Sequence, residues 1–200
     1  MPEMPEQERH LRLFFALRPA TAEGTAALVE LCGAARALCR GEARWLAPDQ
    51  LHMTLAFAGT FPGAKLAALQ EGARAACAGI APFTMQSCGL ALWPTPSQAR
   101  LLVALFAAEP SCMLLASRLA ALLGSLEVPV DKRLFRPHIT LARLKGRCLL
   151  PQQPLATWQW RCASLELLES HLDSQGSRHQ LLARWPFAEH PLTGEDDPAG

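Results

Sequence analysis

Charged residues are scarce in this chain of 200 residues: Lys, Arg, Asp and Glu make up 18% of it and leave a formal net charge of +1. A chain with so little net charge has no global attraction for a polyanion, so any contact with nucleic acid must come from a local patch. Half of the residues are hydrophobic, which supplies a packed interior and argues against a disordered chain. The length is that of one ordinary domain.

Signals for membranes, secretion and disulfide frameworks are absent from the sequence. No uninterrupted apolar run approaches the roughly 18 residues of a membrane-spanning helix. Residues 1–10 are polar and Glu-rich, and no apolar segment of the leader type follows them. The seven cysteines are odd in number and include no C-x-x-C pair, which favours reduced thiols. We therefore expect a soluble, cytoplasmic protein, and the balanced charge favours a monomer.

What the sequence does contain is an internal repeat. A short apolar run, an Ala/Leu-rich helical stretch and a second strand-like run occur in that order at residues 12–17, 20–40 and 51–57, and again at 100–105, 110–124 and 138–142. Each apolar run is long enough for a buried strand and too short for a helix. The shared order at nearly equal spacing predicts a duplication, with repeats at roughly 11–95 and 99–188.

The repeat predicts an α+β fold in which two pseudo-symmetric β-α-β lobes face each other within a single domain, residues 1–200. A further helix is predicted at 63–78, and further strands are predicted at 83–93, 158–170 and 178–187. Residues 173–176, with the sequence Asp-Ser-Gln-Gly, predict a hairpin turn between the last two strands. The two ends, 1–9 and 189–200, are expected to be flexible.

The second strand-like run of each repeat carries the same polar pair. His52 and Thr54 stand two positions apart, as do His138 and Thr140, and Leu-Ala follows each pair. Side chains alternate along a strand, so each His shares one face with its Thr while the apolar neighbours pack on the other face. If a pseudo-twofold axis relates the lobes, a polar cleft holds two imidazoles and two hydroxyls around one point.

That set of groups suits chemistry on a phosphodiester. One imidazole can take a proton from an attacking water while the other gives a proton to the leaving oxygen. The Thr hydroxyls can hydrogen-bond the non-bridging phosphate oxygens as negative charge builds up on them. Histidine pairs at i, i+4 and acidic clusters beside either strand are lacking, so the sequence predicts no metal site and no cofactor.

Basic residues gather around the second pair. Residues 132–147 include six Lys and Arg residues and no acid. Arg143 comes just after the predicted strand, where we expect it to contact the phosphate or an RNA backbone. Each feature also has a purely structural interpretation. Both histidines could be strand residues whose ring nitrogens hydrogen-bond to neighbouring residues, and most of the basic run could be a solvated loop. Phe15 and Trp93 are weak candidates for stacking on a base.

Three segments carry a family resemblance: RLFFAL at 12–17, LHMTLAF at 51–57 and RPHITLAR at 136–143. They resemble the two-histidine (2H) phosphoesterase superfamily, and within it the bacterial RNA 2′,3′-cyclic phosphodiesterases, also called LigT-like or 2′-5′ RNA ligases. The resemblance implies a bilobal α+β fold whose antiparallel sheets frame a central cleft. It also implies metal-independent opening of a terminal RNA 2′,3′-cyclic phosphate to a 2′-phosphomonoester, with reversible 2′-5′ ligation in some members.

The resemblance further implies a role for each residue. His52 would be the proton donor to the leaving 3′ oxygen, and His138 would be the proton acceptor that activates water. Thr54 and Thr140 would hold the phosphate, with Arg143 as an additional anion contact. The partners would be RNA ends or nucleoside 2′,3′-cyclic phosphates.

Other functions stay open on the residues alone. A pseudo-symmetric pair of imidazoles allows either assignment of acid and base. A second enzymatic interpretation is cleavage of linear 2′-5′ oligonucleotides or of another cyclic nucleotide phosphate, and a third is a non-catalytic RNA-end-binding module. The closing strand of the family often carries an aromatic residue where this chain has His179, so the base-stacking side of the pocket departs from the family.

Overall fold

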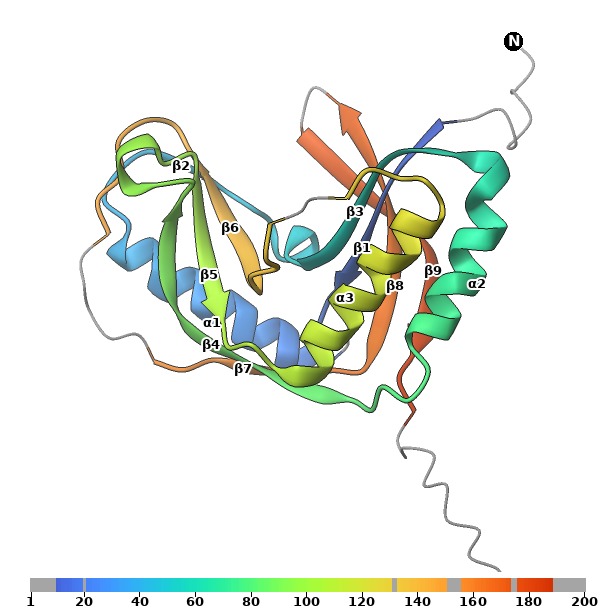
Figure 1. Ribbon diagram of the computed structural model, residues 1–200. Helices are drawn as coiled ribbons and strands as arrows, with labels where there is room; N and C mark the ends of the chain where they lie inside the picture. Colours follow the sequence, from blue (N-terminus) through green and yellow to red (C-terminus); the bar gives the residue numbers. More distant parts are fainter. Residues whose placement is uncertain (1–9, 20, 131–132, 151–155, 174–175, 189–200) are drawn as a thin grey trace, which may run out of the picture.

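The computed structural model (Figure 1) describes residues 10–19, 21–130, 133–150, 156–173 and 176–188. In chain order its elements, with η for a short 3₁₀ helix, are β1 (His10–Leu17), α1 (Ala22–Leu38), β2 (Ala43–Trp45), η2 (Pro48–Gln50), β3 (Met53–Pro62), η3 (Gly63–Lys65), α2 (Leu66–Ala76), β4 (Phe83–Trp93), η4 (Pro96–Gln98), β5 (Leu101–Phe106), α3 (Pro110–Ser125), β6 (His138–Leu144), β7 (Gln159–Cys162), β8 (Ser164–Asp173) and β9 (Gly176–Pro186). The predicted flexible ends, 1–9 and 189–200, lie outside the described residues.

Two antiparallel sheets form the frame of the fold and confirm the predicted α+β class. One has the strand order β3-β1-β8-β9 and the other the order β2-β6-β5-β4-β7. The two sheets can be compared by starting at β3 and at β6, the strands of the two His-x-Thr pairs. The neighbouring strands are then β1 and β8 in the first sheet, and β5 and β4 in the second. The third strand of each set comes from the other half of the chain. Neither sheet is therefore built from one half of the sequence alone, an exchange that the repeat did not predict, and the duplication itself stays a prediction.

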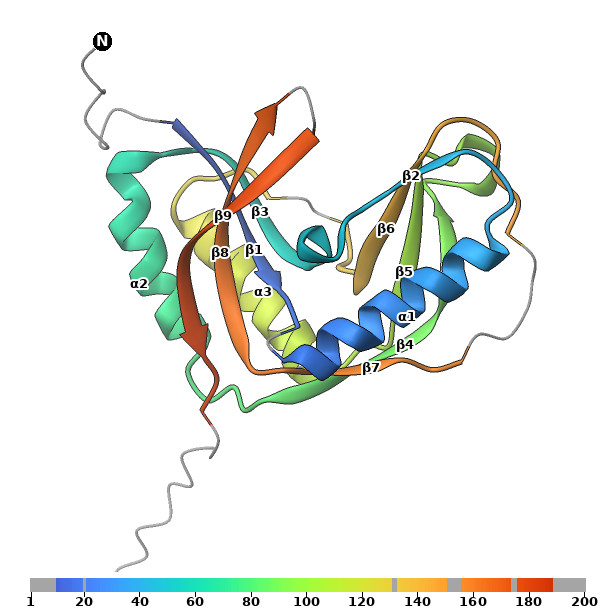
Figure 2. The ribbon, with the colours of Figure 1, turned by 180° about the vertical axis from the view of Figure 1, so that it is seen from behind.

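Helices α1 and α3 also pack on the sheet that does not contain the strand before them. Helix α1, which follows β1, lies along the second sheet and contacts β7 (Figure 2). Helix α3, which follows β5, packs against β3 of the first sheet and against α2. Thr21 caps α1 by accepting a hydrogen bond from the Gly24 amide at 3.1 Å. Buried side chains of both sheets and all three α-helices form one continuous hydrophobic core, so the lobes share an interior.

One local prediction was wrong and one strand was missed. The predicted strand 158–170 is two strands, because the chain leaves the second sheet after β7 and joins the first sheet as β8. Only Ala163 separates the two strands, and the sequence has no Gly, Pro or Asn there to signal a turn at the change of sheet. Strand β2 was missed because its three residues are too few to show a period of two. The predicted hairpin is confirmed: Asp173 pairs with Gly176 where β8 meets β9. Within the described part of the chain, no helix is both long and apolar enough to cross a membrane.

Candidate active site

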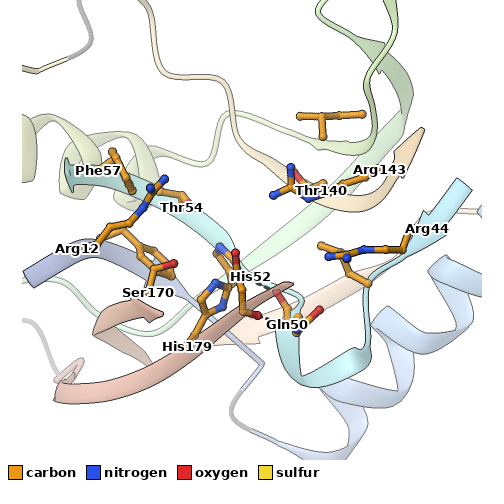
Figure 3. Close-up of a pocket in the computed structure, with 14 residues that line it drawn as sticks. Arg12, Arg44, Gln50, His52, Thr54, Phe57, Thr140, Arg143, Ser170 and His179 are labelled. Atoms are coloured by element: carbon orange, nitrogen blue, oxygen red, sulfur yellow. Dashed lines mark hydrogen bonds between the residues drawn. The ribbon is translucent and has the colours of Figure 1, made fainter. Parts of the chain in front are cut away.

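A pocket opens between the two sheets (Figure 3). One wall comes from β1, β3, β8 and β9, and the facing wall comes from β2, β5 and β6, with the η2 turn between them. The lining residues are Arg12, Phe14, Arg44, Leu46, Gln50, His52, Thr54, Phe57, Leu101, Thr140, Arg143, Ser170, Ser177 and His179. Both halves of the sequence therefore contribute residues to one pocket. A shared pocket of this kind is what the predicted polar cleft between two lobes calls for.

Four of the five predicted site residues line this pocket: His52, Thr54, Thr140 and Arg143. His138, the fifth, is not among the lining side chains. Its ring packs against the indole of Trp93, with 4.4 Å between the ring centroids. His138 is nevertheless close enough for its charge to affect the pKa of His52. The roles of all five residues stay predictions at this point.

Strand alternation explains why the polar pairs face the cleft. Leu51, Met53 and Leu55 are at most 6% exposed and belong to the core, whereas His52 and Thr54 between them are partly exposed. The same alternation recurs on β6, where Ile139 and Leu141 are fully buried. An apolar face turned inward fixes the register of each strand, because a slip by one residue would bury the imidazoles.

The two imidazoles are held in the same way. The Nδ1 atom of His52 lies 2.7 Å from the carbonyl oxygen of Gln50, and that of His138 lies 2.8 Å from the carbonyl oxygen of Arg136. A carbonyl oxygen can only accept, so each Nδ1 must carry the proton and donate it. The Nε2 atom of each neutral ring is then left with a lone pair for proton transfer.

Burial lowers the pKa of every imidazole at the site. The pKa of His52 falls to about 4, chiefly because burial disfavours the charged form, while the hydrogen bond to the Gln50 carbonyl opposes the shift. Positive charge on His179, Arg18 and His138 lowers it further. Burial also lowers the pKa of His138 and that of His179. Near pH 7 these rings are neutral in the free protein, so an acid role requires that a ring take up a proton from solvent when an anion binds beside it.

His179 was noted in the sequence only as a departure from the family, and it was not among the predicted site residues. It lies on β9, lines the pocket, and its ring meets that of His52 edge-on with 4.9 Å between centroids. Phe14 completes a cluster of three rings, 5.0 Å from each imidazole. Gln50 connects the same elements, since its Nε2 donates to the carbonyl oxygen of Ser177 at 2.9 Å. Strand β9 therefore braces the turn that presents His52.

The pocket has the charge of an anion site. Arg12, Arg44 and Arg143 line it, and none of the described side chains that line it is acidic. Arg44 on β2 stands directly opposite Arg143 on β6, so the sheet register sets the two guanidinium groups on one wall. Three guanidinium groups around two imidazoles and two hydroxyls favour a phosphate, which Arg binds through paired N–H donors.

The exposed aromatic side chain that lines the pocket is Phe57, which was not one of the two predicted stacking candidates. Phe15 is fully buried and packs against Trp185, so it cannot stack on a ligand. Phe57 lines the pocket with 48% of its surface exposed, and the guanidinium carbon of Arg12 lies 5.2 Å from its ring centroid. Such a pair offers a flat surface on which a nucleobase can stack. Trp93 stays a candidate, beside His138.

The buried, neutral state of His52 makes stability depend on pH. Its pKa is lowered from 6.5 to about 4, so below pH 6.5 the unfolded chain takes up a proton that the folded chain refuses, and stability falls as the pH falls. We expect His52→Asn to lose less stability than wild type between pH 6.5 and 4.5, by about 2 kcal/mol. Urea unfolding at both pH values measures this.

The exposed imidazole of His10 provides the control for that comparison. His10→Asn is expected to keep the wild-type pH dependence of unfolding. Equal pH dependence in wild type and His52→Asn would contradict the burial of a neutral imidazole at position 52.

No group of three or more His, Cys, Asp or Glu side chains is placed to hold a metal ion, as far as residues 10–188 are described. The donors that converge at the pocket are imidazoles, hydroxyls and guanidinium groups.

Comparisons with known proteins agree with this architecture. Residues 19–103 match the family described as LigT like phosphoesterase. The chain is 32% identical to an RNA 2′,3′-cyclic phosphodiesterase from Geobacillus stearothermophilus over 143 residues, 72% of this chain, and it spans 45% of that relative's length. The structure of TT0787 from Thermus thermophilus matches with a TM-score of 0.74 and 29% identity, over 90% of this chain and 100% of that one.

A second solved structure adds a bound nucleotide. E. coli LigT complexed with 3′-AMP matches with a TM-score of 0.73 and 25% identity, over 90% of this chain and 99% of that one. The match to the family, the curated relative and the shared two-sheet fold lead to one conclusion: the chain belongs to the LigT-like phosphoesterase family.

Proposed function

We propose that the protein opens RNA-terminal 2′,3′-cyclic phosphates to 2′-phosphomonoesters, with His52 and His138 as acid and base and without a metal ion. The observation that carries the proposal is the equivalent setting of the two imidazoles. Each belongs to a His-x-Thr pair, one at the start of β3 and the other at the start of β6, and each has its Nδ1 bound to the carbonyl two residues earlier. The name of the Geobacillus relative supports the same reaction.

In this mechanism the phosphoryl group lies between the two walls of the pocket. Nε2 of His138 takes a proton from water as the water oxygen bonds to phosphorus. The bond from phosphorus to the 3′ oxygen breaks, and His52 gives that oxygen its proton. Hydroxyls of Thr54 and Thr140 and the guanidinium of Arg143 stabilise the non-bridging oxygens. The product keeps its phosphate on the 2′ oxygen.

The lowered pKa of His52 suits it to an acid role that is switched on by substrate. An imidazole with a pKa of about 4 is neutral in the empty pocket, and an anionic phosphodiester beside it favours the charged form. The proton is then held only when there is a leaving oxygen to receive it. A weakly basic His52 also transfers that proton readily, because a stronger acid is a better donor.

The same groups can carry out the same displacement with a nucleophile other than water. If a 5′-hydroxyl takes the place of water, attack on the cyclic phosphate with loss of the 3′ oxygen gives a 2′-5′ linkage. Reversible ligation therefore follows as part of the proposal. Because water is in large excess, hydrolysis is expected to dominate.

The test compares two substrates in EDTA: an oligoribonucleotide with a 2′,3′-cyclic phosphate end and a linear 2′-5′ dinucleotide. We expect the cyclic end to be converted to a phosphomonoester and the linear diester to be consumed far more slowly. The reverse preference would contradict the proposal and favour the linear-diester interpretation. Retention of the cyclic end on the protein without product would instead identify an RNA-end-binding module.

His179 is expected to act by positioning His52. Its ring edge supports the His52 ring at 4.9 Å, so we expect His179→Ala to lower kcat/KM about tenfold. His179→Phe keeps an aromatic ring and should restore most of the rate. Because the charge of His179 lowers the pKa of His52, the limb of the kcat/KM profile set by His52 should move to higher pH in both variants.

The result for His179→Phe separates positioning from simple loss of packing. If His179→Phe is as slow as His179→Ala and both keep the wild-type pH profile, His179 has no positioning role.

The proposal also covers oligomeric state and location: we expect a monomer in the cytoplasm. Light scattering measures the first and cell fractionation the second.

A further inference from the structure

We propose that Cys39 and Cys148 are a covalent modification site, a thiol pair that disulfide oxidants convert to an intramolecular disulfide. The inference concerns a part of the fold away from the candidate active site, and it does not depend on the proposed activity. Both cysteines are free thiols in the structure, and neither lines the pocket.

The two sulfurs are in direct contact. Sγ of Cys39 and Sγ of Cys148 lie 2.7 Å apart, although the residues are separated by 109 positions in the chain. Cys39 is the residue that ends α1, and Cys148 lies after β6. Other cysteines in the described chain have different surroundings: Cys112 lies near the sulfur of Met53, and Cys88 is exposed.

Backbone pairing, and not the thiols alone, brings the two segments together. Arg40 and Leu149, the residues next to the cysteines, form an antiparallel bridge with both N–H···O distances at 3.0 Å. A Cβ atom at Gly41 would lie 2.8 Å from the Arg147 carbonyl oxygen and 3.1 Å from Cα of Cys148. Gly41 also has φ of +155°, so glycine is what permits this close approach. The thiol contact is therefore part of a built junction.

The order of events follows from exposure. Cys39 is half-buried, whereas Cys148 is 2% exposed, so an oxidant reaches Cys39 first. With oxidised glutathione, the Cys39 thiolate attacks one glutathione sulfur, the glutathione disulfide breaks, and one glutathione thiolate leaves. The Cys148 thiolate then attacks Sγ of Cys39 and releases the second glutathione. The two cysteine protons end on the two glutathione thiols.

The pair is slow to react at neutral pH and stabilising once bonded. Burial, followed by the hydrogen bond with Cys148, raises the pKa of Cys39 to about 12, so the attacking thiolate is scarce and alkaline buffer speeds the reaction. The bond would close a loop across 109 positions, which restricts the unfolded chain strongly. It would tie the end of α1 to the segment after β6, beside the β2–β6 edge that carries Arg44 and Arg143.

The test treats the folded full-length protein with oxidised glutathione at pH 8.5. After the remaining thiols are alkylated, peptide mass spectrometry identifies bonded cysteines, and thermal unfolding follows with and without dithiothreitol. We expect a bond between Cys39 and Cys148, loss of two free thiols, and a Tm higher by on the order of 10 °C than in the reduced protein. Cys88→Ser, at the exposed cysteine, should behave as wild type.

Cys39→Ser and Cys148→Ala should abolish both the bond and the Tm increase. The alanine variant avoids placing a hydroxyl at a buried position, and its reduced Tm shows whether it folds. Alkylation of both thiols in treated wild type, a stable glutathione adduct on Cys39, or a bond to another cysteine would each overturn the proposal. A bonded protein with unchanged Tm would overturn the stabilising role.

Discussion

His52→Ala and His138→Ala are each expected to lower kcat/KM for a cyclic phosphate end by at least about a hundredfold. Each variant removes one of the two proton transfers of a single displacement. Without His52 the 3′ oxygen must leave as an alkoxide, and without His138 the nucleophile is neutral water. The hydroxyls and guanidinium groups of the pocket still bind the phosphate, so KM is expected to change much less than kcat.

The double variant gives the sharper result. Since both imidazoles act in one step, His52→Ala/His138→Ala should be scarcely slower than either single variant, and not slower by the product of the two losses. His10→Ala, at an exposed histidine of β1, is the matched control and should retain full activity. Wild-type activity in either single variant would exclude that histidine from the reaction. The result for His138 bears most on the mechanism, because its side chain lies beside the pocket lining and not within it.

Glu166→Ala is expected to cost about 3 kcal/mol of unfolding free energy, the largest stability effect of a single substitution in this account. The Glu166 side chain is 4% exposed and pairs with two arginines. It accepts from Nε of Arg18, and its Oε1 lies 2.7 Å from a guanidinium nitrogen of Arg184. Removing the carboxylate leaves two positive groups side by side. Arg18 and Arg184 are 24% and 54% exposed, so water offsets part of that cost.

Urea unfolding at pH 7.5 measures the effect, with Glu30→Ala on the exposed face of α1 as control. Glu166→Gln keeps an acceptor and should lose about half as much as Glu166→Ala. A loss below about 0.5 kcal/mol, the range of ordinary surface substitutions, would show that the arginines do not depend on Glu166. The variant should also move the limb of the kcat/KM profile set by His52 to lower pH, because the charge of Arg18 already lowers the pKa of His52 and would then be less neutralised.

The sequence could predict which side chains share a face of one strand, because that depends only on the alternation along the strand. His52 and Thr54 alternate with residues that must be buried, so their common face follows from the period of a strand. The same holds for His138 and Thr140. Because the motif occurs twice, we expected both pairs to meet in one cleft. The two antiparallel sheets belong to the predicted α+β class.

What could not be predicted depends on which strands become neighbours. Arg12 and Phe14 stand two positions apart on β1 and both line the pocket, but only the pairing of β1 with β3 and β8 brings them there. Arg44 lies on a strand of three residues that shows no period. His179 reaches His52 because β9 closes the first sheet. These contacts are non-local, and a lone His or Arg in a strand carries no signal of its partner.

The position of the phosphate in the product tests the central claim most directly. Wild type is incubated in EDTA with an oligoribonucleotide that ends in a 2′,3′-cyclic phosphate, and the product is treated with a phosphatase specific for 3′-phosphates. Protonation of the 3′ oxygen by His52 predicts a single product whose phosphate resists that enzyme, because it lies on the 2′ oxygen. A product that loses its phosphate, or no product at all, would contradict the account.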